Sequence, residues 1–444
     1  MNEIKVLGGG HSVGGNKILL KFDNNSVWLD MGITYKYRLE LPEYNIIRGF
    51  SLKRLVSEGL FPQEAVAESM KKKQGERYLN VLISHAHSDH YALITYFRAW
   101  QEAKTNLRLY APIDAYRTLQ ARFELGNLRK VLTNINYRAT EEAEAENFEA
   151  HPIKVDHSMD ASYGYVVETP KIRVGYTGDF RFTSEKDFTQ MTKAFQGVDC
   201  LICEATRVVS HGLQTEEDVR RQVMDLMNRF FNSTVVFIVG WYTYTKRVRT
   251  IIEASGGRKV VLHSKIAHML EAADPTMVKN PRVFVLQLKP KEKLPPGYNS
   301  MTLEEVNQEH GNVVVVIPDT QKRYLWKEET PESILVRPGD VVISSLSEPY
   351  DEDSAHGLLR LADWVTYELK VPLYHVHASG HAPIDRVADF VNAVKPKKLY
   401  VVHFTCQTFE CYDCNKKLQG MLRPRQIKSH NPKGKMNEQQ RREH

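Results

Sequence analysis

The sharpest feature of this sequence is Ser84-His85-Ala86-His87-Ser88-Asp89-His90. It directly follows the apolar run 79–84, which is typical of a short buried strand, so the cluster lies on a strand-to-helix turn. Three imidazoles and one carboxylate at this spacing surround one small volume. They are the ligands that borderline divalent ions such as zinc or manganese prefer. The alternative, a solvated polar loop, is disfavoured because the His-x-His-x-Asp-His pattern lies where an α/β protein carries its active-site loop.

Three further candidate ligands stand at or near the ends of other predicted strands. His157 lies in the segment 156–162, Asp179 follows a strand and a glycine, and His403 ends the apolar run 399–402. Each residue taken alone is more often a structural hydrogen-bonding group. Together with the first cluster they indicate a pair of metal ions.

Length and composition set the broad class of the protein. A chain of 444 residues suggests two or three domains, or one domain with a large insert. The net charge of +6 is mild and compatible with a phosphate-rich partner. Five cysteines do not form a disulfide framework, which favours a reducing cytoplasm. No apolar stretch is long enough for a membrane span and no signal peptide is visible, so we expect no membrane association.

Apolar strands alternate with helical patterns along the chain, which predicts α/β sheets covered on both faces. The first thirty residues read as a β-hairpin with a further strand, and Thr215 opens a capping box before a helix that runs to about Phe231. Further helices are expected near 245–255 and 384–394. The remaining strand candidates are 172–177, 198–203, 234–239, 259–262, 283–286, 313–317, 341–345 and 398–402.

The order of the first ligand cluster, then His157, then Asp179 resembles the metallo-β-lactamase superfamily. The resemblance implies an αββα sandwich with a metal pair at one edge. Asp30, which ends an early strand, resembles the superfamily's first motif. There the aspartate orients the metal-binding loop and does not itself bind metal.

The downstream half is similar to the RNase J group of β-CASP nucleases. The segment 199–206 resembles the acidic β-CASP motif, and 375–382 contains the group's His-Ala-Ser-Gly-His sequence. The glycine-rich segments 7–16 and 30–32 are also RNase J-like. The resemblance covers most of 1–405 and the chain is similar to the shorter archaeal forms. It implies a metallo-β-lactamase domain in two parts, 1–205 and 384–444 (the latter with a basic tail), and an inserted α/β β-CASP domain at 206–383.

The same resemblance assigns the site residues. One ion would be held by His85, His87 and His157, the other by Asp89, His90 and His403, and Asp179 would bridge them. His381 would contact the scissile phosphate, and Glu204 would orient His381. The residues assigned to catalysis are therefore Asp89, Glu204 and His381.

Substrate contacts are expected from two segments. The run His377-Ala378-Ser379-Gly380-His381 would offer backbone N–H groups to phosphate oxygens. The second segment, 240–247, differs from the small Ser/Asn-rich turn that is usual in the family. Its candidate substrate contacts are Thr243, Tyr244 and Lys246, and a packing role for Trp241 is equally open. The segment 38–78 also departs from the family pattern and is expected to cap the site.

The implied reaction is hydrolysis of RNA phosphodiester bonds by a water that two metal ions activate, as a 5′→3′ exonuclease, an endonuclease or both. Zinc is the favoured cofactor, with manganese and magnesium as alternatives. Single-stranded RNA is the expected partner, and a homodimer is left open. The competing functions are a DNA nuclease of the same superfamily and a catalytically inactive nucleic-acid-binding homologue. A structural zinc on Cys406, Cys411 and Cys414 is a further open alternative.

Overall fold

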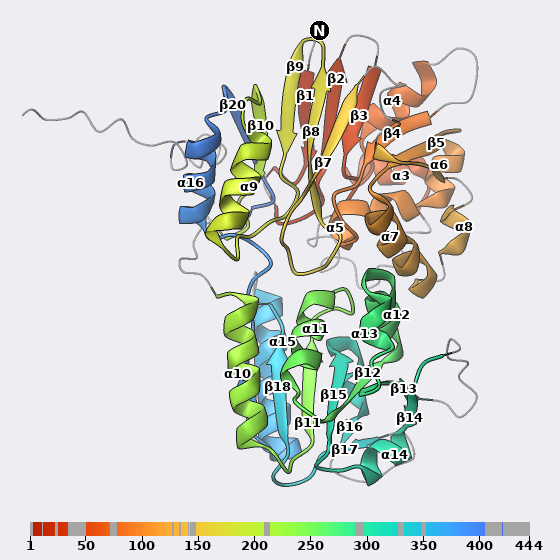
Figure 1. The fold of residues 1–444 in the computed structure, drawn as a ribbon. Coiled ribbons are helices and arrows are strands. Elements are labelled where there is room, and N and C mark those ends of the chain that lie inside the picture. The colour runs from red at the N-terminus through yellow and green to blue at the C-terminus, as the bar shows by residue number, and fades with distance from the viewer. Residues whose placement is uncertain are drawn as a thin grey trace, which may run out of the picture.

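The structure is a computed structural model that consists of two units, stacked as the upper and lower halves of Figure 1. It describes residues 3–10, 12–22, 25–33, 50–71, 78–126, 128–132, 135–140, 142, 148–207, 214–288, 297–326, 333–347, 352–404 and 420. Within these residues no helix is both long and apolar enough to cross a membrane.

The first sheet of the upper unit has six strands in chain order. They are β1 (Glu3–Gly8), β2 (Lys17–Phe22), β3 (Asn25–Leu29), β4 (Tyr78–Leu82), β5 (Asn106–Tyr110) and β6 (Ile135–Arg138). The first three pair antiparallel, as the hairpin pattern predicts, and the others pair parallel. Figure 1 shows α3 (Leu52–Ser57), α4 (Gln63–Lys71), α6 (Phe97–Glu102), α7 (Ile113–Leu125) and α8 (Arg129–Leu132) beside this sheet; α5 (Ser88–Tyr91) and η1 (Ala92–Thr95) follow β4 in the chain.

The second sheet of the upper unit packs against the first. Its order is β20 (Lys398–Val402), β10 (Cys200–Glu204), β9 (Ile172–Tyr176), β8 (Tyr163–Thr169) and β7 (Glu149–Lys154). Trp28 of the first sheet and Tyr165 of the second are buried in one shared core, because each sheet turns one apolar face inward. The opposite face is covered by α9 (Glu185–Phe195) and α16 (Ile384–Val394), where Phe195 and Phe390 pack together. The layers are therefore helix, sheet, sheet, helix, and the predicted αββα sandwich is confirmed.

The lower unit is built on a seven-stranded sheet whose neighbouring strands are all parallel. In order it contains β14 (Ser300–Thr302), β13 (Val283–Gln287), β12 (Lys259–His263), β15 (Val313–Pro318), β11 (Val235–Val239), β18 (Val341–Ser345) and β19 (Leu373–His375). Every residue of β11 and β15 is buried, because helices cover both faces of a parallel sheet.

Two groups of helices cover that sheet. One face carries α10 (Glu216–Arg229), α11 (Thr245–Ala254), α12 (Ser264–Ala273) and α13 (Pro275–Val278). The other carries α14 (Leu303–Gln308), α15 (Glu352–Asp363), η4 (Trp364–Leu369) and the short pair β16 (Leu325–Trp326) and β17 (Ile334–Leu335), with η3 (Asp319–Tyr324) after β15. Thr215 caps α10 in the predicted box with Asp218.

The lower unit is continuous in the chain between β10 and β20, which pair in parallel in the upper unit. The α/β fold with an inserted domain is thus confirmed, and the boundaries at 205 and 383 stay a prediction. Part of the predicted cap over 38–78 forms α3 and α4; residues 38–49 and 72–77 lie outside the described residues. Cys406, Cys411, Cys414 and the basic tail over 421–444 also lie outside them.

Candidate metal centre

The loop after β4 is held by Asp30, which follows β3 in a left-handed backbone conformation (φ 58°). Its Oδ1 accepts a hydrogen bond from the Ser84 amide at 2.7 Å. Its Oδ2 accepts from Ser84 Oγ at 2.7 Å, Tyr176 Oη at 2.6 Å and His90 Nδ1 at 2.6 Å. One buried carboxylate therefore joins the loop to strands of both sheets.

Glycines of the N-terminal segment pack directly against the same loop. A Cβ on Gly14 would lie 2.7 Å from Asp89 Cβ, and a Cβ on Gly32 would lie 1.5 Å from the Asp89 carbonyl oxygen. That carbonyl accepts from the amides of Gly15 and Asn16 at 3.0 and 3.1 Å. The glycine-rich pattern near the N-terminus thus permits a close backbone approach behind Asp89.

A first cluster of imidazoles joins His85, His87 and His157. His85 Nε2 lies 2.9 Å from His87 Nδ1, which lies 3.1 Å from His157 Nε2. Burial, followed by the neighbouring imidazoles, holds the pKa of His85 and of His157 well below its usual value, and burial lowers the pKa of His87 to about 4. The three rings are therefore neutral at pH 7, which is the form that binds a metal ion.

A second cluster joins Asp89, His90, Asp179 and His403. His403 Nε2 lies 2.9 Å from Asp89 Oδ2, and His90 Nε2 lies 3.1 Å from Asp179 Oδ2. His403 follows β20 with φ 56°, so a left-handed turn brings its ring across the edge of the second sheet.

Four of the histidines use Nδ1 for a supporting hydrogen bond. His90 Nδ1 donates to Asp30, and His157 Nδ1 donates to the Gly380 carbonyl at 2.7 Å. His85 Nδ1 lies 3.0 Å from Ser84 Oγ, and His403 Nδ1 lies 2.7 Å from Thr206 Oγ1. Each hydroxyl donates its own proton to a carboxylate, Ser84 to Asp30 at 2.7 Å and Thr206 to Glu204 at 2.5 Å, so each accepts from the imidazole. With Nδ1 protonated in this way, the Nε2 lone pairs of all four rings face the centre.

Asp179 lies between the two clusters. Its Oδ2 is 3.1 Å from His90, 3.5 Å from His403, 3.8 Å from His85, 3.9 Å from His157 and 4.0 Å from His381. One carboxylate oxygen thus approaches ring nitrogens of both clusters, as a group shared by two cations does.

The donor set and its electrostatics fit divalent metal ions. Asp179 Oδ1 is buried and has no hydrogen-bond partner among the described residues. Burial disfavours the Asp179 carboxylate, yet the charges of His403 and His90 outweigh burial and hold its pKa well below the usual range. Burial also disfavours charge on His90, but Asp179, Asp89 and Asp30 raise its pKa well above the usual value. The pocket therefore favours positive charge beside its carboxylates, which bound cations supply.

His381 stands beside the second cluster, its ring stacked on that of His403 with centroids 5.4 Å apart. Its Nδ1 donates to Glu204 Oε1 at 2.9 Å. Burial opposes the charged ring, but the charge of Glu204 and this hydrogen bond raise the pKa of His381 to about 9. Glu204 Oε2 also accepts from Thr206 Oγ1 at 2.5 Å, so Glu204 is linked through Thr206 to His403.

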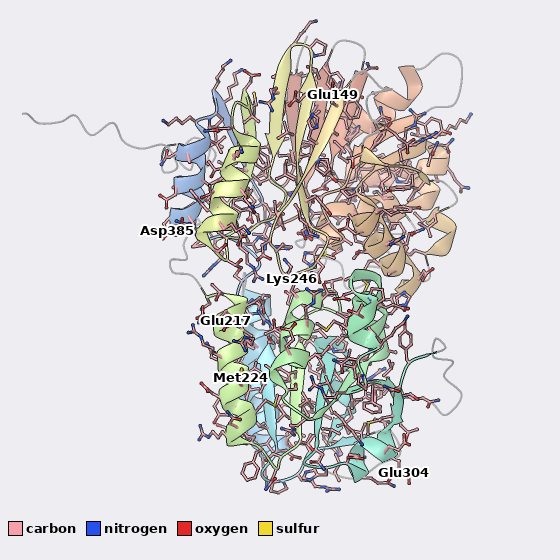
Figure 2. All side chains as sticks on the ribbon, viewed as in Figure 1. Glu149, Glu217, Met224, Lys246, Glu304 and Asp385 are labelled. Atoms are coloured by element: carbon pink, nitrogen blue, oxygen red, sulfur yellow. The ribbon has the colours of Figure 1, made fainter. Side chains whose placement is uncertain are left out.

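The expected substrate residues fall into two groups. The segment 377–381 runs past the centre, and the Gly380 carbonyl contacts His157. Tyr244 is buried with its ring centroid 6.3 Å from that of His87, and Thr243 is buried with its carbonyl accepting from the Thr245 amide at 2.8 Å. Lys246 lies at the junction of the two units (Figure 2), where its Nζ pairs with Asp156 Oδ1. Its ammonium group therefore already has a carboxylate partner.

Several residues at the centre carry no separate sequence signal. Tyr176 and Thr206 lie two or three residues from predicted site residues, but only the packing of two sheets brings them to Asp30 and His403. Arg181 and Arg247 are buried beside the segment 376–380, and nothing in their local sequence distinguishes them from surface arginines.

Comparison with known proteins agrees with this geometry. The family description "Beta-lactamase superfamily domain" matches residues 58–238. The ribonuclease J of Thermus thermophilus is 25% identical over 355 residues, which cover 71% of this chain and 56% of that protein. The ribonuclease J of Corynebacterium glutamicum is 22% identical, covering 90% of this chain and 53% of that protein. The ribonuclease J of Pyrococcus abyssi is 21% identical, covering 91% and 90%.

The chain thus spans little more than half the length of the two bacterial relatives. A crystal structure of an Enterococcus faecalis protein of unknown function matches with a TM-score of 0.67 and 17% identity, covering 91% of this chain and 94% of that chain, and it supports the fold alone. The chain is therefore similar to the ribonuclease J proteins, and its residues 58–238 resemble the β-lactamase superfamily domain.

Proposed function

We propose that this protein is a metal-dependent ribonuclease that hydrolyses phosphodiester bonds of single-stranded RNA. The observation that carries the proposal is the position of Asp179 Oδ2, within 4.0 Å of five imidazole nitrogens, four from the two clusters and the fifth from His381. The relatives named ribonuclease J support the choice of RNA.

In this proposal the first cluster holds one ion and the second cluster the other, with Asp179 shared. The proposed ligands are His85, His87, His157, Asp89, His90, His403 and Asp179. Zinc suits this mixture of imidazole and carboxylate, and manganese or magnesium are the alternatives that metal analysis separates. When bound, two such ions supply an activated water and neutralise charge on the reacting phosphate.

The side chains of the chain itself bind and orient the substrate. His381, fixed through Nδ1 by Glu204, has its Nε2 available to donate a proton to a phosphate oxygen or to the leaving oxygen. Asp89 completes the proposed catalytic set through its contact with His403. Asp30 fixes the tautomer of His90 and so acts behind the ligands.

We further propose that the substrate strand enters between the two units. The backbone of 377–381 then meets the phosphate, and Tyr244 offers an aromatic face near His87 on which a base can stack. Thr243 and Lys246 stay predicted contacts. The domain boundaries at 205 and 383, the cytoplasmic location suggested by the few cysteines, and a homodimer belong to the same proposal.

The test uses RNA and DNA strands of matched sequence, labelled at either end and with different 5′ phosphorylation. We expect RNA cleavage that stops in chelator and returns with zinc or manganese. Equal or faster DNA cleavage would establish the alternative, a DNA nuclease of this superfamily. The position of the first labelled product separates exonuclease from endonuclease activity.

A His381→Ala variant tests the third alternative, an inactive nucleic-acid-binding homologue. We expect kcat to fall by about 10²–10⁴ while RNA binding and metal content stay near those of wild type. His263→Ala is the matched control, because His263 is also buried but lies at the end of β12 and contacts the Lys265 amide. Cleavage by His381→Ala at the wild-type rate refutes the role of His381.

A further inference from the structure

The segment that leads to His381 is held by its backbone carbonyl oxygens. The Val376 carbonyl accepts from Ser345 Oγ at 2.7 Å and from Arg247 Nη1 at 3.3 Å. The Ala378 carbonyl accepts from Arg247 Nη2 at 3.1 Å, and the Ser379 carbonyl from Arg181 Nη1 at 2.9 Å. Two arginine side chains therefore fix three carbonyl groups of this segment.

The two arginines form one unit through Glu216. Arg247 makes a forked pair with this carboxylate, Nε to Oε2 at 3.0 Å and Nη2 to Oε1 at 2.9 Å. Arg181 Nη1 lies 3.4 Å from Glu216 Oε1, and Arg181 Nε lies 2.5 Å from Asp156 Oδ2. Both guanidinium groups are buried, with side chains only 2–3% exposed. We call Arg181 and Arg247 the arginine pair.

Arg247 belongs to the lower unit and Arg181 to the upper one. Arg247 lies on α11, and Arg181 follows Asp179 by two residues after β9. The same helix contacts the loop that carries His157, because Thr245 Oγ1 donates to Asp160 Oδ2 at 2.9 Å. α11 therefore connects to the loops of both His157 and His381.

Fixing these carbonyls also sets the direction of the amide groups that follow them. A trans peptide is planar, with its N–H antiparallel to the preceding C=O. No described peptide bond is cis. The amides of Ser379 and Gly380 therefore point away from the arginine pair. The backbone is also tightly confined at Gly380, since a Cβ there would lie 2.8 Å from His157 Cε1.

The side chains joined around the arginine pair carry one more positive than negative charge. Arg181, Arg247 and Lys246 carry three positive charges, against two negative charges on Asp156 and Glu216, which leaves one positive charge (3 − 2 = +1).

We propose that Arg247, together with Arg181, is a positioning residue: it holds the segment 376–380 so that the amides of Ser379 and Gly380 and the ring of His381 meet the substrate phosphate. This role rests on the proposed ribonuclease function. It gives the lower unit a direct part in the geometry of the metal centre, through α11 and not through contact with the reacting atoms.

The test compares Arg247→Lys with Arg258→Lys. Lysine keeps the charge but cannot make several directed hydrogen bonds from one planar group. Arg258 is the matched control, because it too donates to carbonyls, those of Gly311 and Val313 at 3.2 and 2.9 Å, within the lower unit and away from the centre. Urea unfolding of both variants measures any general loss of stability.

We expect Arg247→Lys to lower kcat on RNA by about 10- to 100-fold with a small change in KM, whereas Arg258→Lys leaves kcat near wild type. In a His381→Ala background, Arg247→Lys should lower kcat by a smaller factor than in wild type, because only the part of its effect that acts through the Ser379 and Gly380 amides remains. Equal losses in both backgrounds overturn the proposal.

Amide hydrogen exchange separates this inference from the proposed function, since it needs no activity. Peptides covering 376–383 should exchange faster in Arg247→Lys than in wild type, and at the wild-type rate in Arg258→Lys. Unchanged exchange in Arg247→Lys overturns the positioning role. If wild-type protein cleaves no RNA but this exchange pattern appears, the ribonuclease function fails and the structural role of the arginine pair stands.

Discussion

Replacing Asp30 by Asn should remove a metal ion without touching a ligand. Asn has nearly the same shape and tolerates the left-handed backbone at this position (φ 58°). Oδ1 can still accept from the Ser84 amide. The other half of the side chain becomes an NH2 group that faces three former donors, Ser84 Oγ, Tyr176 Oη and His90 Nδ1.

The two hydroxyls can rotate to accept, but the imidazole has to move its proton. When His90 Nδ1 accepts from the amide, its proton lies on Nε2 and the lone pair that faces Asp179 is lost. Loss of a supporting hydrogen bond behind a ligand typically costs 10- to 100-fold in metal affinity, or about 1.4–2.7 kcal/mol. Replacing hydrogen bonds to a buried carboxylate by hydrogen bonds to an amide should also lower the free energy of unfolding of the metal-free protein by about 3 kcal/mol.

The assay is chelator competition followed by metal analysis, with urea unfolding of the metal-free protein alongside. We expect one ion per chain to leave at lower chelator concentration, since only the cluster of His90 is affected directly. Asp340→Asn is the matched control, because Asp340 is buried in the lower unit and accepts from the Thr234 amide at 2.8 Å and His310 Nε2 at 2.9 Å. It should lose stability and keep both ions. Asp30→Asn protein that keeps both ions as tightly as wild type would falsify the proposed role of Asp30.

Three other substitutions test separate parts of the structure. Gly14→Ala should weaken metal binding by about tenfold, because the added Cβ displaces Asp89. The control Gly256→Ala (φ +61°, with no atom near the added Cβ) should cost only about 1 kcal/mol of backbone strain. Equal metal affinity in the two variants contradicts the close approach of Gly14 to Asp89. Burial alone would raise the pKa of Glu216, but the arginine pair has the larger effect and lowers this pKa to about 2. Wild type should therefore be more stable than Glu216→Gln by up to about 3 kcal/mol above pH 4.5, and this difference should decline as the pH falls from 4.5 toward 2. A stability difference that is the same at pH 6 and pH 3.5 argues against the ion pair. Burial lowers the pKa of Lys17 from 10.5 to about 8, so the unfolded state binds more protons than the folded state between these pH values. Wild type should therefore gain stability relative to Lys17→Met as the pH rises from 8 to 10. Parallel pH profiles of the two proteins in urea unfolding count against this role of Lys17.

Much of the fold follows from local sequence, because strand and helix signals are short-range. The continuous apolar runs of β11 and β15 predict buried parallel strands, and they form the middle of the third sheet. The capping box at Thr215 predicts where α10 begins. These signals need no knowledge of which strands become neighbours.

The candidate ligands were also predictable from the sequence, since chemical type and spacing mark them. Imidazole and carboxylate groups within one short loop are rare unless they share a ligand, and strand ends bring Asp179 and His403 to the same sheet edge. The sequence could not supply the hydrogen-bond partners behind them. Tyr176 and Thr206 are ordinary residues until strand packing places them against Asp30 and His403.

The parallel and antiparallel strand patterns and the candidate metal ligands follow from the sequence, because periodicity and side-chain chemistry are properties of short segments. The αββα sandwich was expected only from the resemblance to the metallo-β-lactamase superfamily. Three features follow from the packing of distant segments: the nitrogen of each histidine that faces the centre, the pair of Lys246 with Asp156, and the contact of Arg247 on α11 with the backbone before His381. The reason is physical: these features depend on contacts between residues far apart in the chain, Arg247 and Ala378 among them, and their direction is fixed only when the two units pack together.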